Sequence, residues 1–173
     1  SMGPSIPRDT GNQATCQRLW EDGFTSPDPV ICFEYVQDDV DGTQVRLFYP
    51  AWWATDDPRR ARLEPIFEAV SQAVRAYNAY GPNHLHPVTL VVTELAGMDP
   101  GTHSRNADLH ALARPGRTTG PSCYVGVFPS LFNLNEGQSQ QALAHEMFHC
   151  YQYRNLTAQE AGQVVQGQHE RNA

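Results

Sequence analysis

The sequence predicts an α+β fold in which two helices pack on a mixed, mostly antiparallel sheet. Short runs rich in β-branched and aromatic residues are interspersed irregularly with stretches of helical periodicity, and this order is the first observation behind the class. A length of 173 residues suits a single domain with a buried core. The composition, 40% hydrophobic and 18% charged, is that of a globular protein and not of a disordered chain.

The chain is expected to begin with a segment outside the fold. Residues 1–15 are rich in Pro, Gly, Ser and Thr and lack periodicity. The opening Ser1-Met2-Gly3 is typical of what remains after an expression tag is cleaved. We therefore expect residues 1–15 to be a tag remnant and flexible lead-in, and residues 16–173 to form the domain.

A β-hairpin is predicted next. Val30–Val36 and Thr43–Tyr49 are short runs of β-branched and aromatic residues, which favour strands. Asp41-Gly42 lies between them, and both residues tolerate the positive φ angles of a tight hairpin turn.

One helix is predicted after the hairpin. Asp56 or Asp57 can cap it, Pro58 fits its first turn, and Pro65 is a position where it restarts or kinks. Gly81-Pro82 ends it. Apolar residues recur at three- and four-residue steps and define one helical face: Ile66, Phe67, Val70, Ala73, Val74 and Tyr77.

The second half is predicted to hold two more strands and a last helix. Val88–Leu95 is a nearly continuous β-branched run, which suits a central strand covered on both faces. Residues 96–121 lack a pattern and predict a long loop with at most one short strand. Cys123–Phe128 predicts a short strand, and Glu136 to about Arg154 predicts a helix.

Charge and hydropathy argue against a nucleic-acid partner and against a membrane span, respectively. The net charge is −7, and the twelve positive residues form no basic run, so no footprint for nucleic acid is present. No apolar run approaches the roughly 20 residues that cross a bilayer, so no membrane span is expected.

Four cysteines, with no CxxC pair, argue against a zinc site built from cysteine alone. Three full pairings are possible, and four free buried thiols are the alternative. We favour Cys16–Cys32 and Cys123–Cys150, because each bond would join neighbouring elements of the predicted order. Disulfides would place the protein in an oxidising compartment, so we expect a secreted or extracytoplasmic protein, and the absence of Lys favours a bacterial one.

The last predicted helix carries the motif that points to chemistry, His145-Glu146-Met147-Phe148-His149. A spacing of four residues is about 1.1 turns, so the two imidazoles project from one face and can bind one zinc ion. Glu146 lies about 100° around the helix from His145, beside the ion, where its carboxylate can act as general base on a metal-activated water.

The H-E-x-x-H motif and the order of elements over residues 43–154 resemble the zincin metallopeptidases. The resemblance implies a zincin-like fold, with a backing helix and an active-site helix packed on the sheet. It also implies hydrolysis of a peptide or protein substrate. In that superfamily the strand before the active-site helix is the sheet edge that pairs with substrate, which here would be Cys123–Phe128.

The third zinc ligand is the open question of this resemblance. The metzincin pattern needs Gly and His where this chain has Gln152 and Asn155, so a gluzincin-like arrangement fits better. Its ligand Glu follows some twenty or more residues later, and Glu170 lies 21 residues after His149. Glu160, His169, a site of two histidines, or truncation of the domain at its C-terminal end before the true ligand are the alternatives.

Two functions therefore stand as expectations. The first is a zinc-dependent peptidase with His145 and His149 as ligands and Glu146 as general base. The second is a catalytically silent module of the same fold that binds a protein or peptide partner, or lacks its third ligand. The sequence does not predict the oligomeric state.

Overall fold

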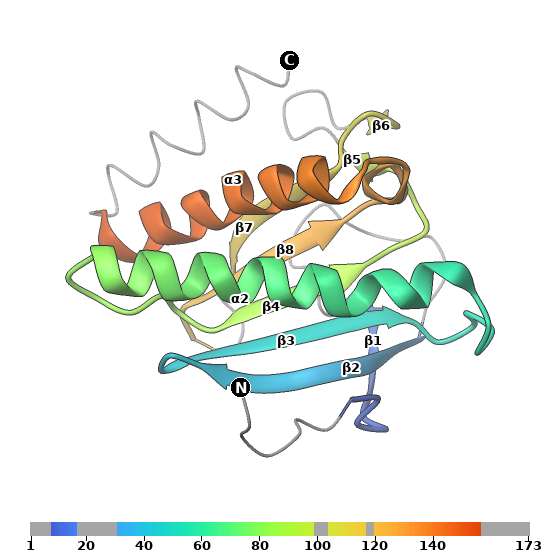
Figure 1. Cartoon of the computed structure of the whole chain (residues 1–173), viewed down its shortest axis with the longest axis horizontal. Coiled ribbons are helices and arrows are strands. Elements are labelled where there is room, and N and C mark those ends of the chain that lie inside the picture. Colours follow the sequence, from blue (N-terminus) through green and yellow to red (C-terminus); the bar gives the residue numbers. More distant parts are fainter. Residues whose placement is uncertain (1–7, 17–30, 99–103, 117–119, 157–173) are drawn as a thin grey trace.

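The computed structural model describes residues 8–16, 31–98, 104–116 and 120–156. It is an α+β molecule with one six-stranded sheet, ordered β1-β2-β3-β4-β8-β7, and two long helices that run side by side across one face of it (Figure 1). The strands of this sheet are β1 (Gln13–Thr15), β2 (Ile31–Val40), β3 (Thr43–Pro50), β4 (Val88–Val92), β7 (Ala111–Gly116) and β8 (Ser122–Val127). The helices are α2 (Leu63–Tyr80) and α3 (Glu136–Asn155), preceded by the 3-10 turns η1 (Pro58–Arg62) and η2 (Pro129–Asn133).

The sheet is mixed, as the sequence predicts. Strands β1, β2 and β3 pair antiparallel, β3, β4 and β8 pair parallel, and β7 pairs antiparallel with β8. All five residues of β4 are buried, in agreement with the prediction of a central strand at Val88–Leu95, although the strand ends at Val92. Among the described residues, no helix combines the length and apolar character that crossing a bilayer requires.

The hairpin between β2 and β3 is confirmed. Val40 pairs with Thr43, and the two residues between them have φ angles of 51° (Asp41) and 85° (Gly42). Positive φ at both central positions is the geometry of a type I′ turn, which matches the twist of the flanking strands. The sequence pattern Asp-Gly therefore sets the register of the hairpin from the turn as far as Val36, beyond which an irregularity shifts the pairing.

The two predicted helices are confirmed with nearly the expected bounds. Asp57 accepts a hydrogen bond from the Arg59 backbone and starts η1, and Pro65 lies in the first turn of α2, where a proline needs no amide partner. The side chain of Asn135 caps α3 by accepting from the Gln138 backbone, while the Gln138 side chain accepts from the Asn135 backbone.

The two helices are fastened to each other at their N-terminal ends by Arg62, the residue that ends η1. Its guanidinium donates to the carbonyl oxygens of Phe132 and Leu134 and to the Ser139 hydroxyl. The Phe132 and Leu134 carbonyls come from the turn before α3, so this contact fixes where α3 begins relative to α2.

The prediction for residues 96–121 was incomplete, because the described residues of this stretch form three strands instead of a loop with at most one. Gly97–Met98 (β5) and Arg105–Asn106 (β6) form a two-stranded ribbon, and β7 joins the main sheet. Strand β7 was not predicted because it ends in Arg114-Pro115-Gly116, and Pro and Gly are typical of turns. Proline is nevertheless tolerated on an edge strand, because its missing amide faces away from the sheet.

The expectation that Cys123–Phe128 forms the sheet edge was wrong. The corresponding strand, β8, lies between β4 and β7, and β7 is the edge strand instead. Strand order depends on pairing between distant parts of the chain, which the local pattern does not encode.

Residues 8–16 are part of the fold, in contrast to the expected flexible lead-in over 1–15. Strand β1 pairs with β2, and the side chains of Thr10 and Asn12 both donate to the buried carboxylate of Glu34. Arg8 makes two hydrogen bonds to Glu64 on α2, and this contact lowers the pKa of the Glu64 carboxyl. A segment without hydrophobic periodicity is thus held by polar contacts.

The core lies between the sheet and the helices, with a smaller cluster formed by side chains of the opposite sheet face. Both favoured disulfides are confirmed. Cys16–Cys32 joins the N-terminal segment to β2, and Cys123–Cys150 joins β8 to α3. The second bond is buried and attaches the helix that carries the H-E-x-x-H motif directly to the sheet.

Candidate metal centre

The motif lies in the second half of α3, on the side of the helix that faces β7. His145 projects outward, with 63% of its side chain exposed, whereas Glu146 and His149 are buried, with exposed fractions of 8% and 3%. A burial difference between residues four apart places the pair at the border between the core and the surface. One imidazole therefore faces the interior and the other faces solvent.

The two imidazoles are close enough to share one ion. Their Nε2 atoms lie 3.3 Å apart, and their ring planes are almost perpendicular at 89°. Two Zn–N bonds of about 2.0–2.1 Å at a tetrahedral angle separate their nitrogens by about 3.3–3.4 Å. The pair therefore already has the separation that two corners of a tetrahedral zinc site require.

Glu146 lies beside this pair. Its Oε2 atom is 3.8 Å from the His145 Nε2 atom, and the three side chains offer ligand atoms that all lie within 4.8 Å of one another. Its Oε1 atom accepts a hydrogen bond of 2.9 Å from the Ala113 backbone amide on β7. One oxygen of the carboxylate thus accepts a hydrogen bond from the edge strand, and the other lies toward His145.

The ring of His149 is oriented by Gln152. The Nδ1 atom of His149 lies 2.9 Å from the Gln152 Oε1 atom. An amide oxygen only accepts hydrogen bonds, so this contact places the proton on Nδ1 and leaves the lone pair on Nε2, toward His145. A fixed tautomer of this kind is typical of the partners that surround metal-bound histidines.

Replacing Gln152 with leucine is expected to weaken zinc affinity about 10- to 100-fold, because the His149 ring loses the acceptor that fixes its tautomer. The measurement is competition with a zinc chelator of known affinity. Gln141→Leu is the matched control, since Gln141 is an exposed residue of the same helix. Equal zinc affinity in both variants would contradict an orienting role for Gln152.

The two tyrosines after the motif have different roles. Tyr151 packs against Tyr77, Tyr80 and Phe148, with ring centroids 5.4 to 6.1 Å apart, as expected for packing. Tyr153 stacks on His149 and donates its hydroxyl to the Ala113 carbonyl oxygen at 3.3 Å. Tyr153 and Glu146 therefore bond to the same residue of β7, Ala113.

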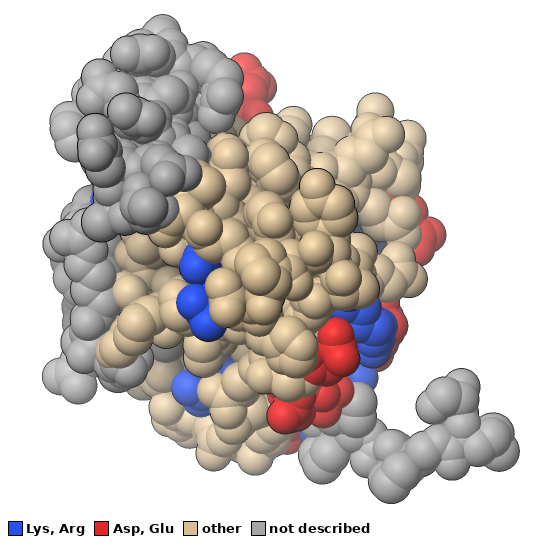
Figure 2. Space-filling model, turned by 90° about the vertical axis from the view of Figure 1, so that its left-hand side faces the viewer, with Lys and Arg blue, Asp and Glu red and all other residues tan. Residues whose placement is uncertain are grey.

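The face seen in Figure 2 is the end of the molecule where α2 and α3 finish, and most of its visible surface is neither acidic nor basic. Tyr80 and Phe148 are exposed on these helices at 81% and 41%. An aromatic cluster therefore joins the C-terminal parts of the two helices, with Tyr77 and Tyr80 on α2 and Phe148 and Tyr151 on α3.

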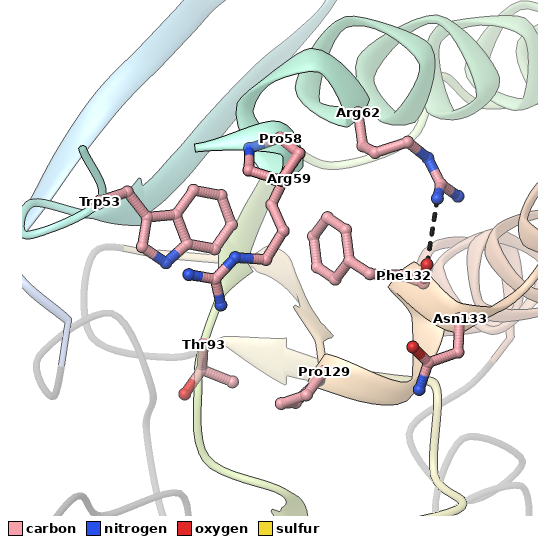
Figure 3. Close-up of a pocket in the computed structure, with 8 residues that line it drawn as sticks. All are labelled: Trp53, Pro58, Arg59, Arg62, Thr93, Pro129, Phe132 and Asn133. Carbon is pink, nitrogen blue, oxygen red and sulfur yellow. Dashed lines mark hydrogen bonds between the residues drawn. The ribbon is translucent and has the colours of Figure 1, made fainter. Parts of the chain in front are cut away.

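A hollow lies away from the motif, where β3, β4 and β8 end (Figure 3). Its volume is about 470 Å³, and Trp53, Arg59 and Phe132 are among the residues that line it. The indole amines of Trp52 and Trp53 both donate to Glu94, which also pairs with Arg59. Glu94 thus gives the indole N–H groups of the exposed Trp52 and the buried Trp53 a common acceptor.

Asp57 belongs to the same network. Hydrogen bonds from Arg59 hold the pKa of the Asp57 carboxyl at about 2, well below its usual range. The Arg59 guanidinium is thus bonded to two carboxylates, those of Asp57 and Glu94, and also lies 4.4 Å from the centre of the Trp53 ring. These contacts tie the residues of the hollow to one another.

The structure brings together three of the four predicted site residues, His145, Glu146 and His149. The fourth, Glu170, lies outside the described residues, as do the alternatives Glu160 and His169. Sequence reasoning missed the Ala113 amide and considered Gln152 only as a departure from the metzincin pattern. Gln152 had a usable signal, because a residue three positions after His149 lies on the same helical face.

No protein-family model, curated protein or solved structure matches the chain, so similarity to known proteins does not identify the function of this site.

Proposed function

We propose that the chain is a zinc-dependent peptidase in which His145 and His149 bind the ion and Glu146 is the general base. One observation carries the proposal: two imidazole nitrogens lie 3.3 Å apart beside a buried carboxylate whose nearer oxygen is 3.8 Å from one of them. Two imidazoles favour zinc among the common metals, although other transition metals accept them too. The 3.8 Å distance exceeds the separation of two ligands at tetrahedral corners, which favours a base over a third ligand.

The third protein ligand is part of the proposal and is assigned to Glu170. A catalytic zinc ion takes three protein ligands and keeps one position for solvent or substrate. Glu170 is the acidic residue whose distance along the chain from His149 best suits the gluzincin-like arrangement. Its carboxylate would complete a set of two nitrogens and one oxygen.

The side chains divide the work as follows. When bound, zinc lowers the pKa of a water molecule toward about 7 and polarises the carbonyl group of the substrate. Glu146 takes a proton from the attacking water and passes it to the leaving amine, so the same carboxylate serves both halves of the reaction. His149 holds its lone pair toward the ion because Gln152 accepts from its other nitrogen.

Two features bear on where the reaction occurs. The two disulfides fit an extracellular protein, since such bonds persist in oxidising compartments. The exposed ring of His145 gives the pair an open side toward solvent, from which a substrate can approach. We therefore propose that the chain acts outside the cytoplasm on peptides or proteins.

The test combines metal analysis with hydrolysis. The purified chain should hold about one zinc ion, and it should cleave members of a diverse peptide library followed by mass spectrometry. A chelator should abolish cleavage, and added zinc should restore it. A chain that binds zinc but cleaves nothing would favour the silent binding module, and a chain that binds no metal would refute the proposed centre.

A further inference from the structure

Ala113 of β7 directs its backbone amide and carbonyl away from β8 and bonds with both of them to side chains of α3. In an antiparallel pair, residues alternate between bonding to the neighbouring strand and facing away from it. The His110 carbonyl accepts from the Phe128 amide, so the bonded residues of β7 are those at even positions. Ala113 is at an odd position, and both its amide and its carbonyl point away from β8.

Both groups are already bonded to the motif helix. The amide donates to Glu146 Oε1 at 2.9 Å, and the carbonyl accepts from the Tyr153 hydroxyl at 3.3 Å. Pro115 is the next outward-facing residue and has no amide hydrogen. An incoming strand therefore does not find the usual row of donors along this part of the edge.

This contact gives the Glu146 carboxylate a donor on the sheet. Glu146 is 8% exposed, and a buried carboxylate needs hydrogen-bond donors in place of those that water would supply. The amide fixes one oxygen, and because the two carboxylate oxygens are rigidly joined, the other is held toward His145 at 3.8 Å. A backbone donor is well suited to this task, since it has no rotamers of its own.

We propose that the Ala113 amide is the positioning group for the general base. At this residue β7 holds Glu146 in place and does not pair with substrate. The inference rests on the proposed function for the meaning of the base, but the contact itself can be tested without it.

The first experiment is hydrogen exchange on the amides of β7, followed by NMR. In Glu146→Ala the Ala113 amide loses its acceptor, and its exchange is expected to become at least about 10-fold faster. The amides of Leu112 and Arg114, which bond to β8, serve as internal controls and should not change. Glu146→Gln keeps an acceptor oxygen and should retain the protection of Ala113.

The second experiment removes the donor. Ala113→Pro deletes the amide and places a ring carbon between the backbone nitrogen and the carboxylate, while the bonds from β7 to β8 remain. We expect kcat to fall about 100-fold or more, with KM and zinc affinity within about twofold of the natural chain. Ala111→Pro is the matched control, since it also deletes an outward-facing amide of β7, and it should keep full activity.

Equal exchange at Ala113 in the natural chain and in Glu146→Ala would overturn the proposal, as would full activity in Ala113→Pro. Should the natural chain hydrolyse nothing, the peptidase proposal fails by itself. The exchange experiment then still decides whether Ala113 holds Glu146.

Discussion

Glu146→Gln is expected to lower the rate of peptide hydrolysis about 100- to 10,000-fold while zinc binding is retained. The amide has the shape of the carboxylate and can still accept from Ala113, but it cannot take a proton from water near neutral pH. His145 and His149 are unchanged, so the metal content should stay at its natural value. The rate is measured at saturating substrate, and zinc is measured on the same sample.

Glu136→Gln is the matched control for this variant. Glu136 lies in the first turn of the same helix, is exposed, and is about three turns from the motif. It carries the same change of charge, so it should hydrolyse at the natural rate. A rate in Glu146→Gln similar to that of the control would exclude Glu146 as the base.

Removing the Cys123–Cys150 bond is expected to give the second large effect. The bond closes a separation of 27 residues, for which the chain-entropy relation gives about 3.5 kcal/mol of stabilisation. Replacing both cysteines with alanine should therefore lower Tm by roughly 7–14 °C for a domain of this size. Zinc affinity should also fall, because Cys150 adjoins His149 and the bond attaches this turn of α3 to the sheet.

The other disulfide provides the control. Cys16–Cys32 spans 16 residues, and its removal should cost about 3 kcal/mol by the same relation. It joins the N-terminal segment to β2, away from α3, so stability should fall by a similar amount while zinc affinity stays unchanged. Equal losses of zinc affinity in the two double variants would mean that the Cys123–Cys150 bond has no local effect on the site.

Local patterns predicted much of this fold. The Asp41-Gly42 turn, the bounds of α2 and α3 and both disulfides agree with the structure. These features depend on a few neighbouring residues, on turn geometry or on the order of elements. Strand β7 was missed because its Pro and Gly are typical of loops, and β8 was misplaced at the edge because strand order depends on distant pairing.

In the site, too, local spacing predicted one part, and contacts between distant residues could not be predicted. The spacing of His145 and His149 predicted a shared face, and the structure brings their nitrogens together. The donor to Glu146 could not be predicted, because every residue except proline has a backbone amide and none marks its partner in the sequence. Residues 8–16 were misjudged for a related reason, since strand pairing, side-chain hydrogen bonds and the Cys16–Cys32 bond hold them, and hydrophobic periodicity does not.

The attachment of α3 at several points has a consequence for how a metal ion enters. Arg62 fixes the start of the helix, the Cys123–Cys150 bond fixes the turn after His149, and Glu146 and Tyr153 bond to β7. Both histidine-bearing turns of α3 are thus held by contacts that involve no metal ion. Zinc uptake should therefore be fast and leave the far-ultraviolet circular dichroism spectrum unchanged, unlike in small zinc domains whose folding is driven by the metal.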